Sequence, residues 1–286
     1  RNIIDIANII EKNGGLGFAR NSGLEIAQGK YIIFVDSDDY VTENMCHLLY
    51  EAAKKYEADV VYGGIFYADG EKIKESKVVT KERVWKGKQE VKDLLLDFIA
   101  TEPNEKKDTI MEVSVWKALF RKKVFDEYDI SFVSERQFIS EDVIFDIDYL
   151  SKCNCVVAIP EPVYFYCVNP NSLSKVFRTD RFNKVKKLYK EILKKLIPIY
   201  GEELSNRRGD RFLIARARTN ARQIIRHEKI IGKNKMMKAL HNICEDQDMN
   251  EIFQRYPIHL LPLKYRLVAY LMKYRCYHLL KIILGR

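Results

Sequence analysis

The fold is indicated first by residues 30–39, KYIIFVDSDD, in which a short apolar run leads directly into an acidic turn. The run from Lys30 to Val35 is rich in β-branched and aromatic side chains, a pattern typical of a buried strand. Three carboxylates, Asp36, Asp38 and Asp39, follow at its carboxyl end. Ligands of open α/β sheets bind at the carboxyl ends of strands, so this turn is the first candidate for a functional site.

The elements around this strand alternate between helix and strand. Helical spacing over residues 17–28 precedes it, a helix capped by Thr42 follows, and Asp59–Gly64 is the next expected strand. This alternation predicts an α/β layer with a mostly parallel sheet. We expect further elements in a helix over 88–100, a helix capped by Ser140, two short strands at 156–159 and 163–167, and helices from about residue 180 onward.

Charge is distributed unevenly along the chain. Residues 1–180 carry 24 Lys+Arg against 31 Asp+Glu, whereas residues 181–286 carry 25 against 9. We therefore expect two domains, an α/β domain over 1–180 and a basic helical extension over 181–286. The composition, 47% hydrophobic and 31% charged, excludes a disordered chain. No apolar stretch reaches the roughly 18 uncharged residues of a membrane-spanning helix.

The acidic turn suits a divalent metal. Asp36 and Asp38 lie two residues apart, so both carboxylates can reach one hard cation that also keeps waters or substrate phosphates as ligands. Such a metal neutralises a diphosphate and stabilises charge on a departing phosphate oxygen. The alternative is a solvated acidic turn that begins the next helix, and the turn alone leaves both readings open.

A wider set of motifs carries a family resemblance. The chain resembles the family 2 glycosyltransferases with a GT-A fold, across about residues 5–180. The matching motifs in the first half are Asn13-Gly14-Gly15, Ala19-Arg20-Asn21, Gly29-Lys30-Tyr31 and Phe34-Val35-Asp36-Ser37-Asp38-Asp39. Those in the second half are Trp116–Arg121, Ser140–Phe145, Tyr164–Tyr166 and Asn169–Ser174, which look like the acceptor half of bacterial members.

The resemblance implies an inverting, metal-dependent transfer of a sugar from a nucleotide-diphosphate donor, foremost a UDP-sugar, to a glycan or lipid-linked acceptor in surface polysaccharide synthesis. Asp36 and Asp38 would hold Mn²⁺ or Mg²⁺, and Asp142, with Glu141 as second choice, would be the general base. Nucleotide binding is expected at Asn13, Gly15 and Arg20 as well as at the two metal ligands. Each of these residues also has a plain structural reading, as a turn, a helix end or a surface ion pair. Tyr164 and Tyr166 are expected near the acceptor, one of them in the core.

Two departures keep other readings open. The family's first strands, which bind the base of the nucleotide, are missing before Arg1, so we expect an exposed sheet edge and either a fragment or a truncated protein. An inactive remnant serving as a membrane-associated binding or scaffold protein is the main alternative. A haloacid-dehalogenase-like phosphatase is disfavoured, because Tyr40 stands where that family has Thr or Val.

The carboxyl-terminal residues 256–286 contain six Lys or Arg and no acid, among many leucines and tyrosines. This composition suits a helix on an anionic membrane surface, or alternatively helices packed on their own domain. We therefore expect a cytoplasmic protein that can sit peripherally on the inner face of the plasma membrane. The arginines of residues 207–226 accompany no nucleic-acid motif, so a nucleic-acid partner is not expected.

Overall fold

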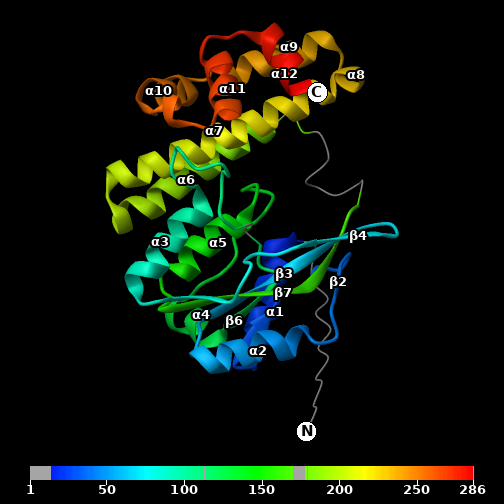
Figure 1. Ribbon diagram of the computed structural model, residues 1–286, viewed down its shortest axis with the longest axis vertical. Helices are drawn as coiled ribbons and strands as arrows, with labels where there is room; N and C mark the ends of the chain where they lie inside the picture. Colours follow the sequence, from blue (N-terminus) through cyan, green and yellow to red (C-terminus); the bar gives the residue numbers. More distant parts are fainter. Residues whose placement is uncertain (1–13, 112–113, 170–177, 179, 286) are drawn as a thin grey trace. The chain divides into compact units, whose positions relative to one another are not determined.

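The computed structural model describes residues 14–111, 114–169, 178 and 180–285 (Figure 1). Contacts divide the chain into two compact units. The first comprises residues up to Val91 together with Ser114–Cys167, and the second comprises Lys92–Val113 together with Val168–Arg286. Residues 92–113 thus pack with the carboxyl-terminal helices, although they lie inside the expected first domain. The division into functional domains at residue 180 stays a prediction.

The first unit is built on one curved sheet. Its strands follow the order β1-β6-β3-β7-β2, with β4 paired to β3 and β5 paired to β7. The strands are β1 (Tyr31–Ile33), β2 (Tyr40–Val41), β3 (Val60–Asp69), β4 (Lys72–Ser76), β5 (Arg83–Lys86), β6 (Ala118–Arg121) and β7 (Cys155–Cys167). Among the described strands, β1 pairs only with β6, so β1 is an edge strand in the described part of the sheet.

The α/β class is confirmed, but the sheet is mixed instead of mostly parallel. Only β3 and β7 pair in parallel among the described strands, and the other five pairings are antiparallel. Because β6 lies between β1 and β3 and runs opposite to both, β1 and β3 still point the same way. The two strands expected at 156–159 and 163–167 are one long strand, β7, which continues through Pro160-Glu161-Pro162. Its pairing with β3 shifts register there.

The described residues of the first unit also form four helices: α1 (Leu16–Ile26), α2 (Met45–Tyr56), α4 (Lys122–Tyr128) and α5 (Glu141–Leu150). The amphipathic α2 buries Met45 and Leu49 against Val61 and Val157 of the sheet, which is the burial that holds most such helices in place. The expected cap at Thr42 is wrong, because Thr42 precedes the actual N-cap, Asn44. Ser140 is the N-cap of α5, as expected, but makes no side-chain capping bond. Ser140 instead has a left-handed backbone, with φ of 61°.

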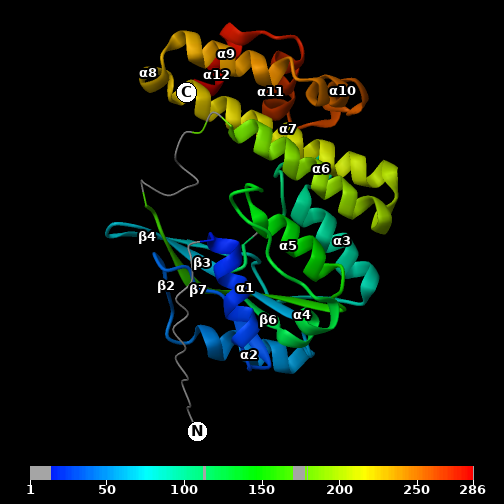
Figure 2. The same ribbon diagram turned by 180° about the vertical axis from the view of Figure 1, so that it is seen from behind.

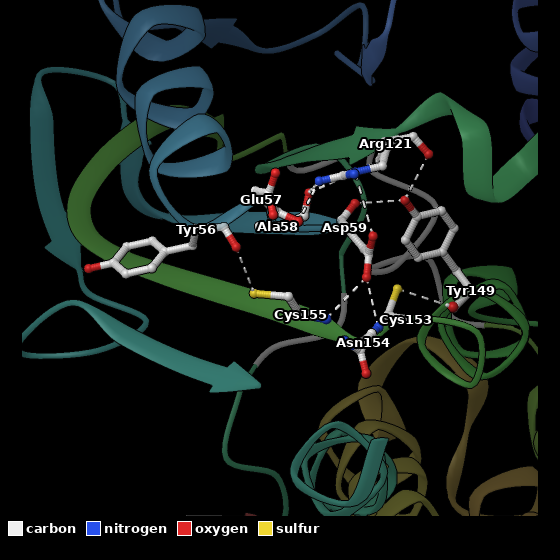
Figure 3. A network of polar contacts seen from close by, with 9 residues as sticks. All are labelled: Tyr56, Glu57, Ala58, Asp59, Arg121, Tyr149, Cys153, Asn154 and Cys155. Carbon is white, nitrogen blue, oxygen red and sulfur yellow. Dashed lines mark hydrogen bonds and ion pairs between the residues drawn. The ribbon is translucent and has the colours of Figure 1, made fainter. Parts of the chain in front are cut away.

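A polar network anchors the far end of α5 to the sheet (Figure 3). The Tyr149 hydroxyl lies 2.8 Å from the carbonyl oxygen of Asp59 and 3.1 Å from that of Arg121. The Asp59 carboxylate accepts from the backbone N–H groups of Asn154 and Cys155, at 2.7 and 3.0 Å. These bonds join β3, β6 and β7 to the carboxyl-terminal end of α5. The opposite end of that helix, which holds Glu141 and Asp142, is thereby given a defined position.

The second unit is helical in the residues described. The helix α3 (Lys88–Ile99) begins in the first unit, and most of it packs in the second. The long helices α6 and α7 lie side by side in both views (Figure 1, Figure 2). The helices after residue 180 are α6 (Arg181–Tyr200), α7 (Glu202–Arg226), α8 (Glu228–Ile231), α9 (Lys233–Cys244), α10 (Gln247–Arg255), the 3-10 turn η1 (Ile258–Leu260), α11 (Leu263–Lys273) and α12 (Tyr277–Gly285).

The basic carboxyl-terminal helices divide their apolar residues between the core and solvent. Val268, Leu271 and Leu280 are buried, which agrees with helices packed on their own unit. Leu263, in contrast, is 73% exposed, and Leu267 lies exposed one turn further along α11. None of the helices in the described residues is long and apolar enough to span a membrane.

Candidate active site

A cavity of about 770 Å³ lies in the first unit between α1 and the segment from Tyr31 to Asp38. Small residues of α1, including Ala19 and Gly23, line one side of it, so space remains between the helix and the strand. The open edge of β1 and the acidic turn after it form the other side. Arg20, Asp36 and Asp38 all line this cavity, which makes it the candidate active site.

Residues of β7 hold the acidic turn in place through hydrogen bonds. The Asp36 backbone N–H donates to the Tyr164 hydroxyl at 3.1 Å, and that hydroxyl donates to Oδ2 of Asp39 at 2.8 Å. Oδ1 of Asp39 accepts from the Cys167 backbone N–H at 2.7 Å. Burial raises the pKa of Tyr164, so its hydroxyl keeps its proton and can donate. Asp39 thus fastens the turn to the sheet, while Asp38 is exposed to solvent.

Arg20 is the centre of the site's electrostatics. Its side chain is buried, and one nitrogen, Nη1, lies 3.1 Å from Oε1 of Glu141 and 2.9 Å from Oδ1 of Asp142. The other, Nη2, lies 3.1 Å from Oδ1 of Asp36. Burial by itself would lower the pKa of Arg20, but the three carboxylates raise it, so the guanidinium stays charged. Arg20 therefore joins the acidic turn to the start of α5.

Two aromatic rings lie beside the Arg20 guanidinium and shield it from water. Its central carbon lies 5.2 Å from the ring centroid of Phe132 and 6.0 Å from that of Phe34. The neighbouring Asn21 fixes the loop that carries Phe132, since its side chain bonds to both the backbone N–H and the carbonyl of that residue, at 2.7 and 2.9 Å. Charge pairs in such an environment interact more strongly than they do in water.

Glu141 and Asp142, the two acids at the start of α5, both have raised pKa values. Burial, followed by the neighbouring charge of Asp142, raises the pKa of Glu141 to about 8. Burial also raises the pKa of Asp142, although the Arg20 cation opposes this shift. Two adjacent carboxyls behave as one coupled pair, which holds a proton near neutral pH. A pair of this kind can accept a proton from a hydroxyl and release it again.

The acidic turn has the donor chemistry that a divalent metal needs. Asp36 and Asp38 supply hard carboxylate oxygens at the rim of one cavity, and such oxygens suit Mn²⁺ and Mg²⁺. No group of three or more His, Cys, Asp or Glu side chains in the described part of the chain is arranged to hold a metal. A cation here would therefore take its remaining ligands from water or from a bound diphosphate, as Mg²⁺ commonly does.

Four of the expected site residues come together: Arg20, Asp36, Glu141 and Asp142. Asp38 shares their cavity, and Asn13 lies outside the described residues.

Gly15 is the N-cap of α1 and does not line the cavity. It has φ of 102°, and a Cβ there would lie 2.2 Å from Oε1 of Glu135. That carboxylate accepts from the Gly17 backbone N–H at 3.2 Å, so it caps the helix from a distant loop. Sequence reasoning missed Glu135 and the turn-holding role of Asp39, because no local pattern connects either residue to its partner. Of the two tyrosines expected near the acceptor, Tyr164 is the core residue and Tyr166 is half-buried.

Comparison with known proteins finds a family that matches part of the chain. Residues 8–129 match the family described as glycosyl transferase family 2. This match covers less than half of the chain, so over these residues the chain is similar to family 2 glycosyltransferases, and its fold is GT-A.

Individual relatives agree with this assignment. The chain is 29% identical over 175 residues to the uncharacterized glycosyltransferase EpsJ of Bacillus subtilis, a match covering 59% of this chain and 46% of EpsJ. It is 24% identical to the poly(ribitol-phosphate) beta-N-acetylglucosaminyltransferase TarP of Staphylococcus aureus, over 87% of this chain and 74% of TarP. It covers only 24% of the glycosyltransferase GlyA of Streptococcus pneumoniae, so it spans less than half of two of these relatives.

A solved structure shows the same fold. The crystal structure of S. aureus TarS 1–349 in complex with UDP-GlcNAc superposes with a TM-score of 0.61 at 16% identity, over 95% of this chain and 71% of TarS 1–349.

Proposed function

We propose that this chain transfers a sugar from a nucleotide-diphosphate donor, foremost a UDP-sugar, to a hydroxyl of a glycan or lipid-linked acceptor, with inversion. The observation that carries the proposal is the Arg20 cluster, which joins an acidic turn at the cavity rim to the acid pair of α5. The resemblance to glycosyltransferases supports it, as does a structural relative that was crystallised with UDP-GlcNAc.

In this mechanism Asp142 is the general base. As the acceptor oxygen bonds to the anomeric carbon of the donor, the acceptor proton passes to the Asp142 carboxylate and the bond from that carbon to the diphosphate breaks. Arg20 holds Asp142 in place and favours its ionised form. Glu141 keeps the shared proton, so that the pair carries one negative charge before the reaction.

Asp36 and Asp38 would hold Mn²⁺ or Mg²⁺, which when bound neutralises the leaving diphosphate. Of these two ligands, Asp36 is oriented by Arg20 and by the Tyr164 hydroxyl, whereas the exposed Asp38 is free to turn toward a diphosphate. Nucleotide contacts of Arg20, Gly15 and Asn13 also stay proposals. For Arg20, the three ion pairs favour a positioning role instead.

An aromatic surface supports the acceptor assignment. Trp116 is half-buried, with its ring centroid 5.7 Å from that of Tyr166 in a stacked arrangement and 4.4 Å from that of Tyr164. Sugars pack well on such ring faces. We assign the acceptor sugar to this platform, and surface polysaccharide or teichoic acid synthesis to the protein, because relatives such as TarP act on poly(ribitol-phosphate).

The decisive experiment separates donor binding from transfer. Thermal unfolding of the 286-residue chain is followed with Mn²⁺ and a panel of nucleotide diphosphates, and sugar transfer is followed with the corresponding nucleotide sugars. Asp38→Asn should abolish the metal-dependent rise in Tm, because it removes a ligand. Asp142→Asn should retain that rise and lose transfer by 1,000-fold or more. Undiminished transfer by Asp142→Asn would exclude it as the base.

The alternative of an inactive binding or scaffold protein has no specific observation in its favour. It predicts no metal-dependent nucleotide binding, so the same unfolding experiment tests it.

Peripheral membrane contact is proposed for the exposed apolar side of α11. Leu263 and Leu267 project into solvent beside the exposed Lys264, a combination that suits an anionic surface. Replacing both leucines by Ser should reduce co-flotation with phosphatidylglycerol vesicles at least 5-fold, and phosphatidylcholine vesicles should bind neither form. Equal flotation of both forms with phosphatidylglycerol would remove this surface from consideration.

A further inference from the structure

Asn21 follows Arg20 in α1, and it lines a separate cavity of about 620 Å³ instead of the candidate active-site cavity. Its side chain is half-buried and forms two hydrogen bonds with the backbone of Phe132, 111 positions further along the chain. The Asn21 amide nitrogen donates to the Phe132 carbonyl oxygen at 2.9 Å, and the Asn21 amide oxygen accepts from the Phe132 backbone N–H at 2.7 Å. One helical side chain thus holds both backbone groups of a loop residue.

The loop that carries Phe132 lies directly against the start of α1. A Cβ on Gly17 would lie 2.1 Å from the carbonyl oxygen of Val133, so only glycine allows this approach. The Gly17 backbone N–H also donates to the Glu135 carboxylate at 3.2 Å. Together with the two bonds of Asn21, these contacts fix the backbone of residues 132–135 on the first two turns of α1.

The buried ring of Phe132 contacts three parts of the proposed active site. It stacks on the ring of Phe145, with centroids 4.2 Å apart and planes inclined by 6°. The guanidinium carbon of Arg20 lies 5.2 Å from its centroid, and the ring of Phe34 lies edge-on to it, with centroids 5.1 Å apart. Because Phe145 lies one turn beyond Asp142 in α5, the Phe132 ring stands between the cation and the helix that carries the proposed base.

We propose that Asn21 is a positioning residue for sugar transfer, because by fixing Phe132 it holds the Arg20 guanidinium against Asp142. This inference rests on the proposed function, in which Asp142 is the general base. An aromatic face attracts a cation, so a fixed Phe132 ring favours one place for the guanidinium. If the two bonds of Asn21 are lost, the loop and its ring can move, and a displacement of about 1 Å is enough to impair a reaction that depends on alignment.

Asn21→Ala tests the proposal in the full 286-residue chain. We expect kcat to fall about 10-fold at pH 7, because the base is misaligned. The KM for the nucleotide sugar should change less than about 2-fold, because Asn21 does not line the active-site cavity. A weaker contact between Arg20 and Asp142 also raises the pKa of Asp142, so the acid limb of the kcat/KM profile should move up by about one pH unit.

Ser22→Ala is the matched control. It removes a hydrogen bond from the neighbouring position of α1 to the Phe18 carbonyl oxygen, and it should change none of these three quantities. A loss of transfer in Asn21→Ala that only follows its folded fraction, with an unshifted acid limb, would show a merely structural residue and overturn the proposal.

A double substitution tests whether Asn21 acts through Phe132. Phe132→Leu keeps an apolar side chain but removes the ring that Arg20 and Phe145 contact, so it should lower kcat at least as much as Asn21→Ala. Adding Asn21→Ala to Phe132→Leu should then lower kcat by less than about 2-fold more, because both changes remove the same restraint. Losses that simply multiply in the double variant would contradict the proposed route through Phe132.

An NMR titration keeps this test separate from that of the proposed function. The isotope-labelled carboxyl group of Asp142, assigned by comparison with Asp142→Asn, should titrate about one pH unit higher in Asn21→Ala and unchanged in Ser22→Ala. If this shift is found but the unsubstituted chain transfers no sugar, the proposed function fails and the link from Asn21 to Asp142 stands. If transfer is found and the titration of Asp142 is unshifted, the link fails and the proposed function stands.

Discussion

The guanidinium of Arg20 lies 2.9 Å from the carboxylate of Asp142, although 122 positions separate them in the chain. The same guanidinium lies 3.1 Å from Asp36. One buried side chain thus connects the end of a strand to the beginning of a helix, which are the two places where the metal ligand and the base are proposed. The distance between those groups depends on Arg20, and so do their charges.

Replacing Arg20 should destabilise the fold in a pH-dependent way. Arg20→Gln leaves three partly buried carboxylates without a cation, which costs about 3–5 kcal/mol in the free energy of unfolding near pH 8. The pKa values of Glu141 and Asp142 are already raised, so both carboxyls take up protons as the pH falls, and the loss should shrink toward pH 5. Urea unfolding at both pH values measures this difference.

The control for that experiment is Arg136→Gln. Arg136 is exposed, and its pair with Glu135, at 3.8 Å, is a surface contact worth little. Arg136→Gln should change the free energy of unfolding by less than about 0.5 kcal/mol at either pH. A loss for Arg20→Gln that is the same at pH 5 and pH 8 would show that the carboxylates are not what its charge stabilises.

Glu141→Ala should move the pH profile of sugar transfer. The Glu141 carboxyl hydrogen-bonds to Asp142 and thereby lowers the pKa of Asp142, against the effect of burial. Because ionised Asp142 is the proposed base, kcat/KM should rise with pH as Asp142 loses its proton. Ala removes the hydrogen bond, so we expect the acid limb of the profile to shift up by about one pH unit, which corresponds to about 1.4 kcal/mol of lost stabilisation of the ionised form. An unshifted limb would argue against coupling between the two acids.

Tyr164→Phe should loosen the acidic turn without disturbing the rings around it. The substitution removes the bonds to the Asp36 backbone and to the Asp39 carboxylate, at 3.1 and 2.8 Å. We expect stability to fall by about 1–2 kcal/mol and the Mn²⁺ concentration for half-maximal transfer to rise about 10-fold. Tyr166→Phe, on the same strand, is the control and should alter the Mn²⁺ requirement less than 2-fold. The same requirement in both variants would remove Tyr164 from metal positioning.

Asp146 should make the folded state less stable as the pH rises. It is fully buried on α5, near the Tyr62 hydroxyl, and burial raises its pKa well above the usual range. The folded state then holds a proton that the unfolded chain releases above about pH 4. Unfolding free energy should fall by up to about 1.4 kcal/mol per pH unit until the folded state also ionises.

Asp146→Asn should make the fall of unfolding free energy with pH less steep, as measured by urea unfolding between pH 5 and pH 8, while the share that Glu141 and Asp142 contribute should remain. Asp126→Asn, at an exposed position of α4, should leave the full slope unchanged. A slope in Asp146→Asn equal to that of the unsubstituted chain would mean that Asp146 is ionised in the folded state.

Much of the fold follows from local patterns. The apolar run from Lys30 to Val35 and the pattern over residues 59–64 are both strands, and the helical spacing before and after them is also correct. Such patterns are readable because side chains alternate at fixed periods in strands and helices. Which strands pair with one another, in contrast, cannot be read from local patterns. The insertion of β6 between β1 and β3 made the sheet mixed, and that depends on residues almost 90 positions further along.

The amino-acid sequence by itself determined the α/β class, the acidic turn after a strand and the acid pair at a helix start, because each is a short motif with its own chemistry. Only the tertiary structure decided that one arginine would join them, since its partners come from segments more than a hundred residues apart. The same holds for the hydrogen bonds of Tyr164 to the acidic turn. Burial and charge compensation are properties of packed neighbours, and a chain acquires those neighbours only when it folds.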